Sequence, residues 1–291
     1  MENWQLRQRQ NNPLEVKIVM SETRIREWYE YWNGNVSVSF SGGKDSTVLL
    51  HLVRKLYPNV PAVFCDTGLE YPEIRNFVKT IDNVTWIKPK MNFKEVIEKY
   101  GFPVIGKATS QKIYEIRNTN SEKLKNIRMF GDYRGEREML PKKWRFLISA
   151  PFLISSLCCD KLKKIPFNNY EKNTKRKPII GTLAVDSQLR AKSYLKYGCN
   201  SFEEKYPKSQ PLSFWIDMDI WTYLKLYKIP YSKIYDMGEK RTGCMFCMFG
   251  VHLEKGRNRF QRMKITHPKQ YDYCINKLGC GKVLDFINVP Y

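Results

Sequence analysis

The chain has 291 residues, 42% of them hydrophobic, and is therefore long enough to bury a full core. It has no run of about 18 apolar residues and no secretory signal at its start, so we expect a cytoplasmic protein without a membrane partner. Fifty Lys and Arg against 29 Asp and Glu give a net charge of +21, which argues against an ordinary metabolic enzyme and predicts polyanionic partners. The alternative is that the lysines only keep the surface solvated.

Apolar periodicity alternates between helix and strand along much of the chain. The predicted helices cover residues 14–34, 46–57, 71–81 and 92–101, and the predicted strands cover 35–40, 61–68, 83–89 and 177–187. Because strands that alternate with helices are joined by right-handed crossovers, we predict an α/β fold with a doubly wound, mostly parallel sheet and helices on both faces. Ligands of such sheets bind at the carboxyl ends of the strands.

The domain boundaries are predicted from where this alternation begins and ends. Residues 1–35 form a helical lead-in, 36–250 a nucleotide-binding domain, and 251–291 a basic C-terminal extension with a weak helical pattern. Residues 105–149 are polar and basic without a clear period, so we expect an excursion from the core there.

A glycine pair and a lysine stand between the first predicted strand and its helix, in the sequence SFSGGKDS of residues 39–46. Gly42 and Gly43 let the backbone approach an oxyanion, the helix start directs amide groups at it, and Lys44 adds positive charge. This is not a Walker A loop, because Asp45 follows the lysine where that motif needs Ser or Thr. The sequence therefore predicts another kind of phosphate-binding loop rather than an ordinary turn.

Several motifs resemble one known superfamily. SFSGGKDS resembles the PP-loop of the adenine nucleotide alpha hydrolases, and residues 64–77 and 211–238 resemble segments of the sulfonucleotide (APS and PAPS) reductases. The resemblance covers roughly residues 36–250 and implies a nucleotide cleft with Lys44 and Asp45 as catalytic residues. It implies that the phosphates are held by Ser39, Ser41, Gly42, Gly43, Lys44, Asp45 and Ser46, that Asp66, Thr67 and Gly68 flank the adenosine, and that Asp186 and Arg190 close the site.

Four cysteines form two pairs, Cys158 with Cys159 and Cys244 with Cys247. Four thiolates can bind zinc or an iron-sulfur cluster. Two adjacent side chains reach one small ion awkwardly, whereas a 4Fe-4S cube offers a separate iron to each sulfur. The pattern therefore favours a 4Fe-4S cluster over zinc or unliganded thiols, and it resembles the cluster-binding pattern of the iron-sulfur APS reductases.

One feature of the reductases is missing from this sequence. They carry a nucleophilic cysteine in a C-terminal Glu-Cys-Gly-Leu-His sequence, which does not occur here. This disfavours reduction of a sulfonucleotide. Cys280, between two glycines, is either a mobile substitute or, as we expect, a hydrophobic cysteine in a turn. Other relatives that pair a PP-loop with a cluster, among them the ATP pyrophosphatase of DNA phosphorothioation and the tRNA thiolation enzymes, activate an acceptor with ATP before delivering sulfur.

We therefore expect an ATP-dependent adenylylating enzyme of sulfur insertion or transfer that serves nucleic-acid modification. Its expected cofactors are ATP, Mg²⁺ and a 4Fe-4S cluster. Its expected partners are an adenine nucleotide, DNA or tRNA, a cysteine desulfurase or other sulfur donor, and a second copy of the chain in a homo-oligomer. The basic clusters at 161–164, 172–177 and 254–264 are expected to contact the nucleic acid. An APS or PAPS reductase with a non-standard or external thiol, and a non-catalytic nucleotide-binding subunit, remain as alternatives.

Overall fold

The computed structural model describes residues 1–133, 135 and 138–291, and these residues form two compact units. Unit 1 contains Met1–Asp66, Tyr71–Lys88 and Phe167–Thr242, and unit 2 contains Thr67–Glu70, Pro89–Pro166 and Gly243–Tyr291. Each unit is therefore assembled from separated stretches of chain. The boundaries expected at residues 35 and 250 stay a prediction. Within the described residues, no helix is both long and apolar enough to cross a membrane.

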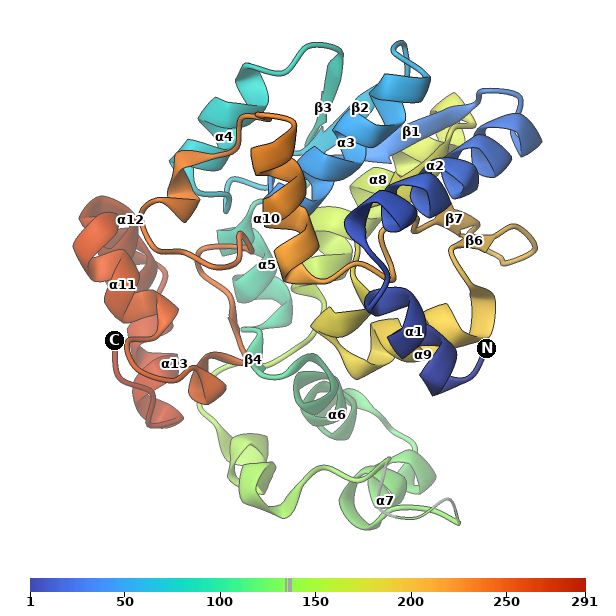
Figure 1. Cartoon of the computed structure of the whole chain (residues 1–291). Helices are drawn as coiled ribbons and strands as arrows, with labels where there is room; N and C mark the ends of the chain where they lie inside the picture. Colours follow the sequence, from blue (N-terminus) through green and yellow to red (C-terminus); the bar gives the residue numbers. More distant parts are fainter. Residues whose placement is uncertain (134, 136–137) are drawn as a thin grey trace. The chain divides into compact units, whose positions relative to one another are not determined.

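A six-stranded sheet forms the centre of unit 1 (Figure 1). Its strands are β1 (Val36–Ser39), β2 (Ala62–Cys65), β3 (Val84–Ile87), β5 (Lys177–Ile180), β6 (Asn200–Ser201) and β7 (Lys208–Ser209). Their order across the sheet is β3-β2-β1-β5-β7-β6, and all neighbours are parallel except β6 and β7. The predicted α/β fold with a mostly parallel sheet is confirmed.

Helices connect and cover these strands. Unit 1 holds α1 (Asn3–Gln10), α2 (Leu14–Tyr31), α3 (Lys44–Leu56), α4 (Pro72–Lys79), most of α8 (Ile165–Thr174), η4 (Ala184–Asp186), α9 (Gln188–Tyr197), α10 (Asp217–Leu226) and η5 (Lys233–Tyr235). Because β1, β2 and β3 succeed one another in one direction, right-handed crossovers place α3 and α4 on one face and the return through α8 on the other. Helix α10 lies beside α3 (Figure 1).

The core of unit 1 consists of the apolar residues predicted from the sequence pattern. Val36 and Val38 on β1, Ala62 on β2 and Leu49 and Leu52 on α3 are completely buried. Burying one large aliphatic side chain contributes about 1.5–3 kcal/mol. The first strand and the helix after it are therefore held firmly, and the loop between them has fixed ends.

Unit 2 is mostly helical, with a small parallel pair of strands, β4 (Val104–Ile105) and β8 (Met248–Phe249). Its helices before β8 are α5 (Phe93–Tyr100), α6 (Lys107–Asn118), α7 (Glu122–Phe130), η2 (Lys142–Ser149) and the π-helix η3 (Asp160–Lys164). After β8 come η6 (Val251–Leu253), α11 (Arg259–Thr266), α12 (Pro268–Asp272), the π-helix η7 (Tyr273–Lys277) and α13 (Cys280–Phe286).

Two segments without a clear sequence pattern thus contain regular structure. Residues 105–149 include α6, α7 and η2, apart from 134, 136 and 137, which lie outside the described residues. Helix α7 buries none of its residues, so it contributes nothing to the core. The basic C-terminal extension is present and packed, because Phe260, Met263 and Leu284 are buried within unit 2.

Candidate functional site

The loop predicted to bind phosphate joins β1 directly to α3 in unit 1. Gly42 has a φ of 70°, and a Cβ there would lie 2.7 Å from a valine methyl group. A Cβ on Gly43 would lie 2.7 Å from Oγ1 of Thr242. Both positions therefore require glycine, Gly42 for its conformation and Gly43 for the close approach of another segment.

Hydroxyl groups hold the loop in shape. The N–H of Ser41 donates to Oγ of Ser46 at 3.2 Å, and the N–H of Gly43 donates to Oγ of Ser41 at 3.3 Å. The hydroxyls of Ser46 and Thr47 both donate to the carbonyl of Gly43, at 2.9 and 3.0 Å. The serines predicted to hold phosphate therefore also fix the backbone whose amides would do so, while Ser39 is the last residue of β1.

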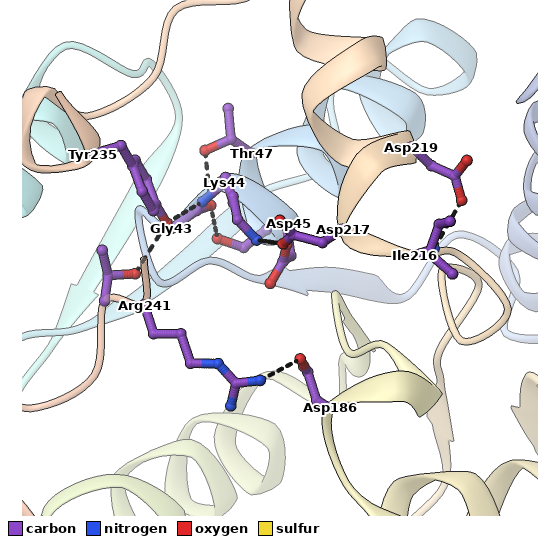
Figure 2. Close-up of polar contacts among 12 residues, drawn as sticks. Gly43, Lys44, Asp45, Thr47, Asp186, Ile216, Asp217, Asp219, Tyr235 and Arg241 are labelled. Atoms are coloured by element: carbon purple, nitrogen blue, oxygen red, sulfur yellow. Dashed lines mark hydrogen bonds and ion pairs between the residues drawn. The ribbon is translucent and has the colours of Figure 1, made fainter. Parts of the chain in front are cut away.

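Lys44 is buried and lies between two carboxylates, as Figure 2 shows. Its Nζ is 3.0 Å from Oδ1 of Asp45 and 2.5 Å from Oδ1 of Asp217. Burial opposes the charge of Lys44, but the two carboxylates outweigh it and raise its pKa, so the side chain is a permanent cation. The pKa of Asp45 is raised, chiefly by burial. Lys44 opposes this rise, and nearby Asp186 and Asp217 add to it.

Asp217 reaches Lys44 because it is the first residue of α10. The N–H of Ile216 donates to Oδ2 of Asp219 at 2.7 Å, and the same oxygen lies 2.6 Å from Nζ of Lys17, a buried residue of α2. Asp219 therefore caps the start of α10 and ties it to α2. This arrangement holds Asp217 beside the loop (Figure 2).

Residues near the end of unit 1 reach the same loop. The N–H of Lys44 donates to the hydroxyl of Tyr235 at 2.8 Å, and that hydroxyl lies 3.2 Å from Oγ1 of Thr242. Burial raises the pKa of the Tyr235 phenol, which is therefore neutral at physiological pH. A neutral hydroxyl thus accepts the hydrogen bond of the first N–H of α3.

The two residues predicted to close the site also lie in this part of unit 1. Asp186 forms an ion pair with Arg190. It also lies 3.1 Å from Nη2 of Arg241 (Figure 2). Since Asp186 also raises the pKa of Asp45, it stands within electrostatic range of the loop. Whether these residues contact a nucleotide stays a prediction.

The residues predicted to flank the adenosine belong to different units. Asp66, in unit 1, is buried and accepts a hydrogen bond of 2.9 Å from Nη2 of Arg75. Thr67, in unit 2, donates its N–H and its hydroxyl to the carboxylate of Glu70, at 2.8–2.9 Å. Gly68 has a φ of 77°, which favours glycine. Their predicted contact with adenosine stays a prediction.

The two cysteine pairs lie in unit 2. Cys158 and Cys159 precede the π-helix η3, and their Sγ atoms are 4.0 Å apart, so both thiols are reduced. The pKa of Cys158 is raised by its hydrogen bond to Cys159, by burial, and by the nearness of Cys159, Cys247 and Cys244. Cys158 therefore interacts electrostatically with the other three thiols of the two pairs.

Cations accompany these thiols. Burial lowers the pKa of Lys163, but Cys244 and Glu70 outweigh this effect and raise it. Nη1 of Arg259 donates to the carbonyl of Cys247 at 3.1 Å. Positive charge beside a set of sulfur ligands offsets the negative charge that these ligands carry when a metal binds.

The donor set suits a four-cysteine cluster in its chemistry. Among the described residues, no group of three or more His, Cys, Asp or Glu is arranged to hold a single metal ion. Four reduced thiols in unit 2, two of them 4.0 Å apart, with Lys163 near Cys159 and Cys244 and with Arg259 near Cys247, nevertheless match the number and type of ligand that an iron-sulfur cluster takes.

The other four cysteines, Cys65, Cys199, Cys274 and Cys280, are buried. Cys280 begins α13 and is completely buried, and its hydrogen bond, together with burial, raises the pKa of Cys274. Cys280 therefore lies in the interior of unit 2, as the first residue of a helix and not in the turn that we expected.

The side chain of His51, on α3, has a partner within unit 1, because its Nδ1 lies 2.9 Å from the hydroxyl of Tyr223.

Four residues around the loop were missed by sequence reasoning: Asp217, Tyr235, Arg241 and Thr242. The two aspartates in IDMDIW at the start of α10 were a usable signal, because acidic residues two apart at a helix start cannot both act as the cap. No comparable local signal marks Tyr235, whose contact with Lys44 spans 191 positions.

Residues 35–249 match the family of the phosphoadenosine phosphosulfate reductase domain, and the chain belongs to this family. This match covers the loop, both cysteine pairs and α10, which together define a protein of the PP-loop type. The predicted membership of the PP-loop, PAPS reductase-like family is thereby confirmed.

Three proteins with similar sequences include two uncharacterised proteins and one reductase. The uncharacterised protein MJ0973 of Methanocaldococcus jannaschii is 28% identical over 264 residues, which cover 87% of this chain and 51% of that protein. A second protein of that organism, MJ0066, is 29% identical over 260 residues, which cover 87% of this chain and 43% of that protein. The chain therefore spans about half the length of these two relatives. Adenosine 5'-phosphosulfate reductase 2 of Bacillus subtilis is 23% identical over 79% of each chain.

Two solved structures were also found to be similar. The PAPS reductase of Candida auris is 16% identical with a TM-score of 0.46, over 84% of this chain and 96% of that one. The U34-tRNA thiolase NcsA of Methanococcus maripaludis, solved with its [4Fe-4S] cluster, is 14% identical with a TM-score of 0.39, over 93% of this chain and 80% of that one. Scores this low support no argument about function.

Proposed function

We propose that this protein is an ATP-dependent adenylylating enzyme, an ATP pyrophosphatase of sulfur insertion that acts on nucleic acid or with a nucleic-acid-modifying partner. The observation that carries the proposal is the surroundings of Lys44. A glycine loop, a helix start and a buried ammonium group converge there within unit 1. Such a combination suits the phosphates of MgATP.

The proposed reaction has two displacements and no net oxidation. An oxygen of the acceptor attacks the α-phosphorus of MgATP, the bond to the bridging oxygen breaks, and pyrophosphate leaves. Hydrosulfide then forms a bond to the activated acceptor atom, and AMP leaves with the bonding electron pair. Lys44 would offset negative charge that develops on the phosphates in the first step, and Asp45, 3.0 Å from its Nζ, would orient it.

Reduction of a sulfonucleotide is the second candidate, and family membership favours it. Such a reduction needs a thiolate that can approach the sulfonucleotide. All eight cysteines are buried or half-buried, and Cys280 is completely buried. This candidate therefore depends on a thiol from another molecule. The third candidate, a non-catalytic nucleotide-binding subunit, predicts binding without turnover.

We propose that Cys158, Cys159, Cys244 and Cys247 hold a 4Fe-4S cluster. When bound, such a cluster supplies an iron site for sulfur or a centre for electron transfer. Lys163 and Arg259 would offset its negative charge, because Lys163 lies beside Cys244 and Arg259 binds the carbonyl of Cys247.

The nucleic-acid part of the proposal depends on which cations are available. Several predicted contributors are engaged inside the protein: Arg176 donates to the carbonyl of Val36, Lys177 lies 5.0 Å above the ring of Trp32, and Arg259 forms an ion pair with Glu254. Four others in the same clusters are exposed to solvent: Lys172 and Lys175 in unit 1, and Lys255 and Arg257 in unit 2.

Charge reversal at these exposed cations tests the proposed nucleic-acid contact. For wild-type protein, log affinity for tRNA or DNA should fall linearly with log salt, with a slope of several units, because phosphate contacts release counterions. Reversal of Lys172, Lys175, Lys255 and Arg257 to Glu should flatten this slope while ATP binding is unchanged. If the wild type binds neither nucleic acid at low salt, this part of the proposal is wrong.

The proposed catalysis is tested by where ATP is cleaved. Protein purified without oxygen is given MgATP, sulfide and either tRNA or DNA, and the nucleotide products are separated. We expect AMP and pyrophosphate in equal amounts, and neither product with Lys44→Ala. ADP with inorganic phosphate, or bound ATP without any turnover, would contradict an adenylylating enzyme.

A further inference from the structure

The segment 232–242, which we call the strap, contacts the phosphate loop from outside the β1–α3 connection. Tyr235 of the strap accepts a hydrogen bond of 2.8 Å from the N–H of Lys44. Thr242, at its end, has its Oγ1 at 2.7 Å from where a Cβ of Gly43 would stand. The strap therefore touches the two consecutive residues at which α3 begins, and Figure 2 shows Tyr235 directed at them.

The N–H of Lys44, which donates to Tyr235, is one of the backbone amides with which the loop would bind a phosphate. Helix α3 begins at Lys44, its N-cap is Gly43, and no side chain caps it. The first amides of such a helix have no partner within the helix, and they bind anions readily. The Tyr235 oxygen therefore stands where a phosphate oxygen would accept the same hydrogen bond.

The side chain of Lys44 is satisfied within the protein as well. Its Nζ lies 3.0 Å from Asp45 and 2.5 Å from Asp217, whose side chain is 64% exposed. A bound phosphate would need both the amide and the ammonium group of this residue. Both donors are thus already paired in the structure, one with the strap and one with carboxylates.

The ring of Tyr235 is held by packing, and its hydroxyl contacts Lys44 and Thr242. Trp221 meets the ring edge-on with centroids 5.4 Å apart, and Tyr231 lies 6.2 Å away. The hydroxyl can donate to Thr242, 3.2 Å away, while it accepts from Lys44. Removal of this one oxygen would therefore free the amide and leave the aromatic packing in place.

We propose that Tyr235 holds the place of a phosphate oxygen, and that the strap withdraws from Lys44 when the triphosphate of a nucleotide enters the loop. This inference rests on the proposed function, since it concerns the same loop. Tyr235 would thus compete with the ligand for the N–H of Lys44. If the contact must break before the ligand binds, only the molecules with an open contact can bind it. The apparent affinity is then the intrinsic affinity multiplied by the fraction of molecules in which the contact is open.

The test compares Tyr235→Phe with wild type by equilibrium dialysis against ATP, pyrophosphate and adenosine. A neutral hydrogen bond corresponds to roughly a fivefold change in an equilibrium constant, so Tyr235→Phe should bind ATP and pyrophosphate about fivefold more tightly. Adenosine, which has no phosphate, should bind equally to both. Tyr231→Phe is the matched control, because its hydroxyl contacts Asp236 at 3.1 Å and not the loop.

Other results would overturn the inference. Weaker binding of ATP and pyrophosphate by Tyr235→Phe would make the phenol a ligand of the phosphate, and unchanged binding would make it structural only. Amide hydrogen exchange gives a second readout: exchange of residues 233–242 should rise when pyrophosphate is added to the wild type, and protection there would contradict withdrawal. If wild-type protein binds neither ATP nor pyrophosphate, the proposed function itself fails, and the inference with it.

Discussion

Lys44 and Asp217 stand 173 positions apart in the chain, and their Nζ and Oδ1 atoms lie 2.5 Å apart in unit 1. The contact joins the first residue of α3 to the first residue of α10. It places a carboxylate beside a lysine that sequence reasoning associated only with its neighbour Asp45. The cation of the proposed phosphate site therefore has two acidic partners.

Lys44→Ala and Asp45→Ala should each lower ATP turnover by at least about 100-fold, since the first removes the cation beside the transferred charge and the second removes the carboxylate that orients this cation. The fold should survive, because Asp217 is 64% exposed and water can hydrate it when Lys44 is gone. The rate of AMP formation from ATP and the melting temperature are the two measurements. Lys55→Ala, on the same helix, is the control and should turn over ATP normally; equal losses in all three variants would contradict a specific role.

Lys17→Met should destabilise unit 1 by about 3–5 kcal/mol, because it leaves Asp219 buried without its cation. The exposed fractions are 1% for the side chain of Lys17 and 12% for that of Asp219. Urea unfolding measures the effect. Lys55→Met should cost about 1 kcal/mol or less, because the cation of Lys55 is 46% exposed and its partner Glu22 keeps Arg26 at 3.3 Å. A similar cost for both variants would mean that the buried pair contributes no more than the half-exposed pair.

Stability between about pH 5 and pH 7 should depend on His51. Burial, and then Lys55, lower the pKa of its imidazole in the folded protein. Below the usual histidine pKa the unfolded chain therefore binds the extra proton first, so stability is lost as the pH falls through this range and regained as it rises. The increase in unfolding free energy from pH 5 to pH 7 should be smaller in His51→Asn. An identical increase in both proteins would contradict this assignment.

Protein purified without oxygen should be brown and contain about four iron atoms per chain, as a four-cysteine cluster requires. Replacement of any one of Cys158, Cys159, Cys244 or Cys247 by Ser should remove most of the iron and the visible absorption. Cys199→Ser is the control, because Cys199 is buried in unit 1 and should leave both unchanged. A colourless protein with stoichiometric zinc would rule out the iron-sulfur cluster.

The strand, loop and helix around Lys44 could be predicted because their signals are local. The apolar pattern of β1 and α3 changes period at Gly42 and Gly43, where the backbone must turn tightly. Contacts that depend on the tertiary fold could not be predicted in this way. Asp217 and Tyr235 reach Lys44 only after the chain has crossed the sheet, and nothing in their neighbouring residues encodes this.

Segments with little local pattern account for most of the remaining gap. Helix α7 has nine residues and α12 has five, so neither can carry an apolar stripe over several turns. The buried residues of the C-terminal helices do repeat at helical spacing, as Phe260 and Met263 do on α11, but α11 and α13 have only eight and seven residues. The sequence also did not show that two basic residues lie beside cysteines, Lys163 near Cys244 and Arg259 at the carbonyl of Cys247.

The central claim is that ATP, and not a sulfonucleotide, is the substrate. Direct competition tests it: anaerobic protein receives equal concentrations of MgATP and adenosine 5'-phosphosulfate, with sulfide, a reducing thiol and nucleic acid, and pyrophosphate and sulfite are measured in the same reaction. We expect pyrophosphate to form with AMP, no sulfite above the level of a no-protein control, and loss of the pyrophosphate in Lys44→Ala. Sulfite release without pyrophosphate, abolished by the same substitution, would contradict the account and establish a sulfonucleotide reductase.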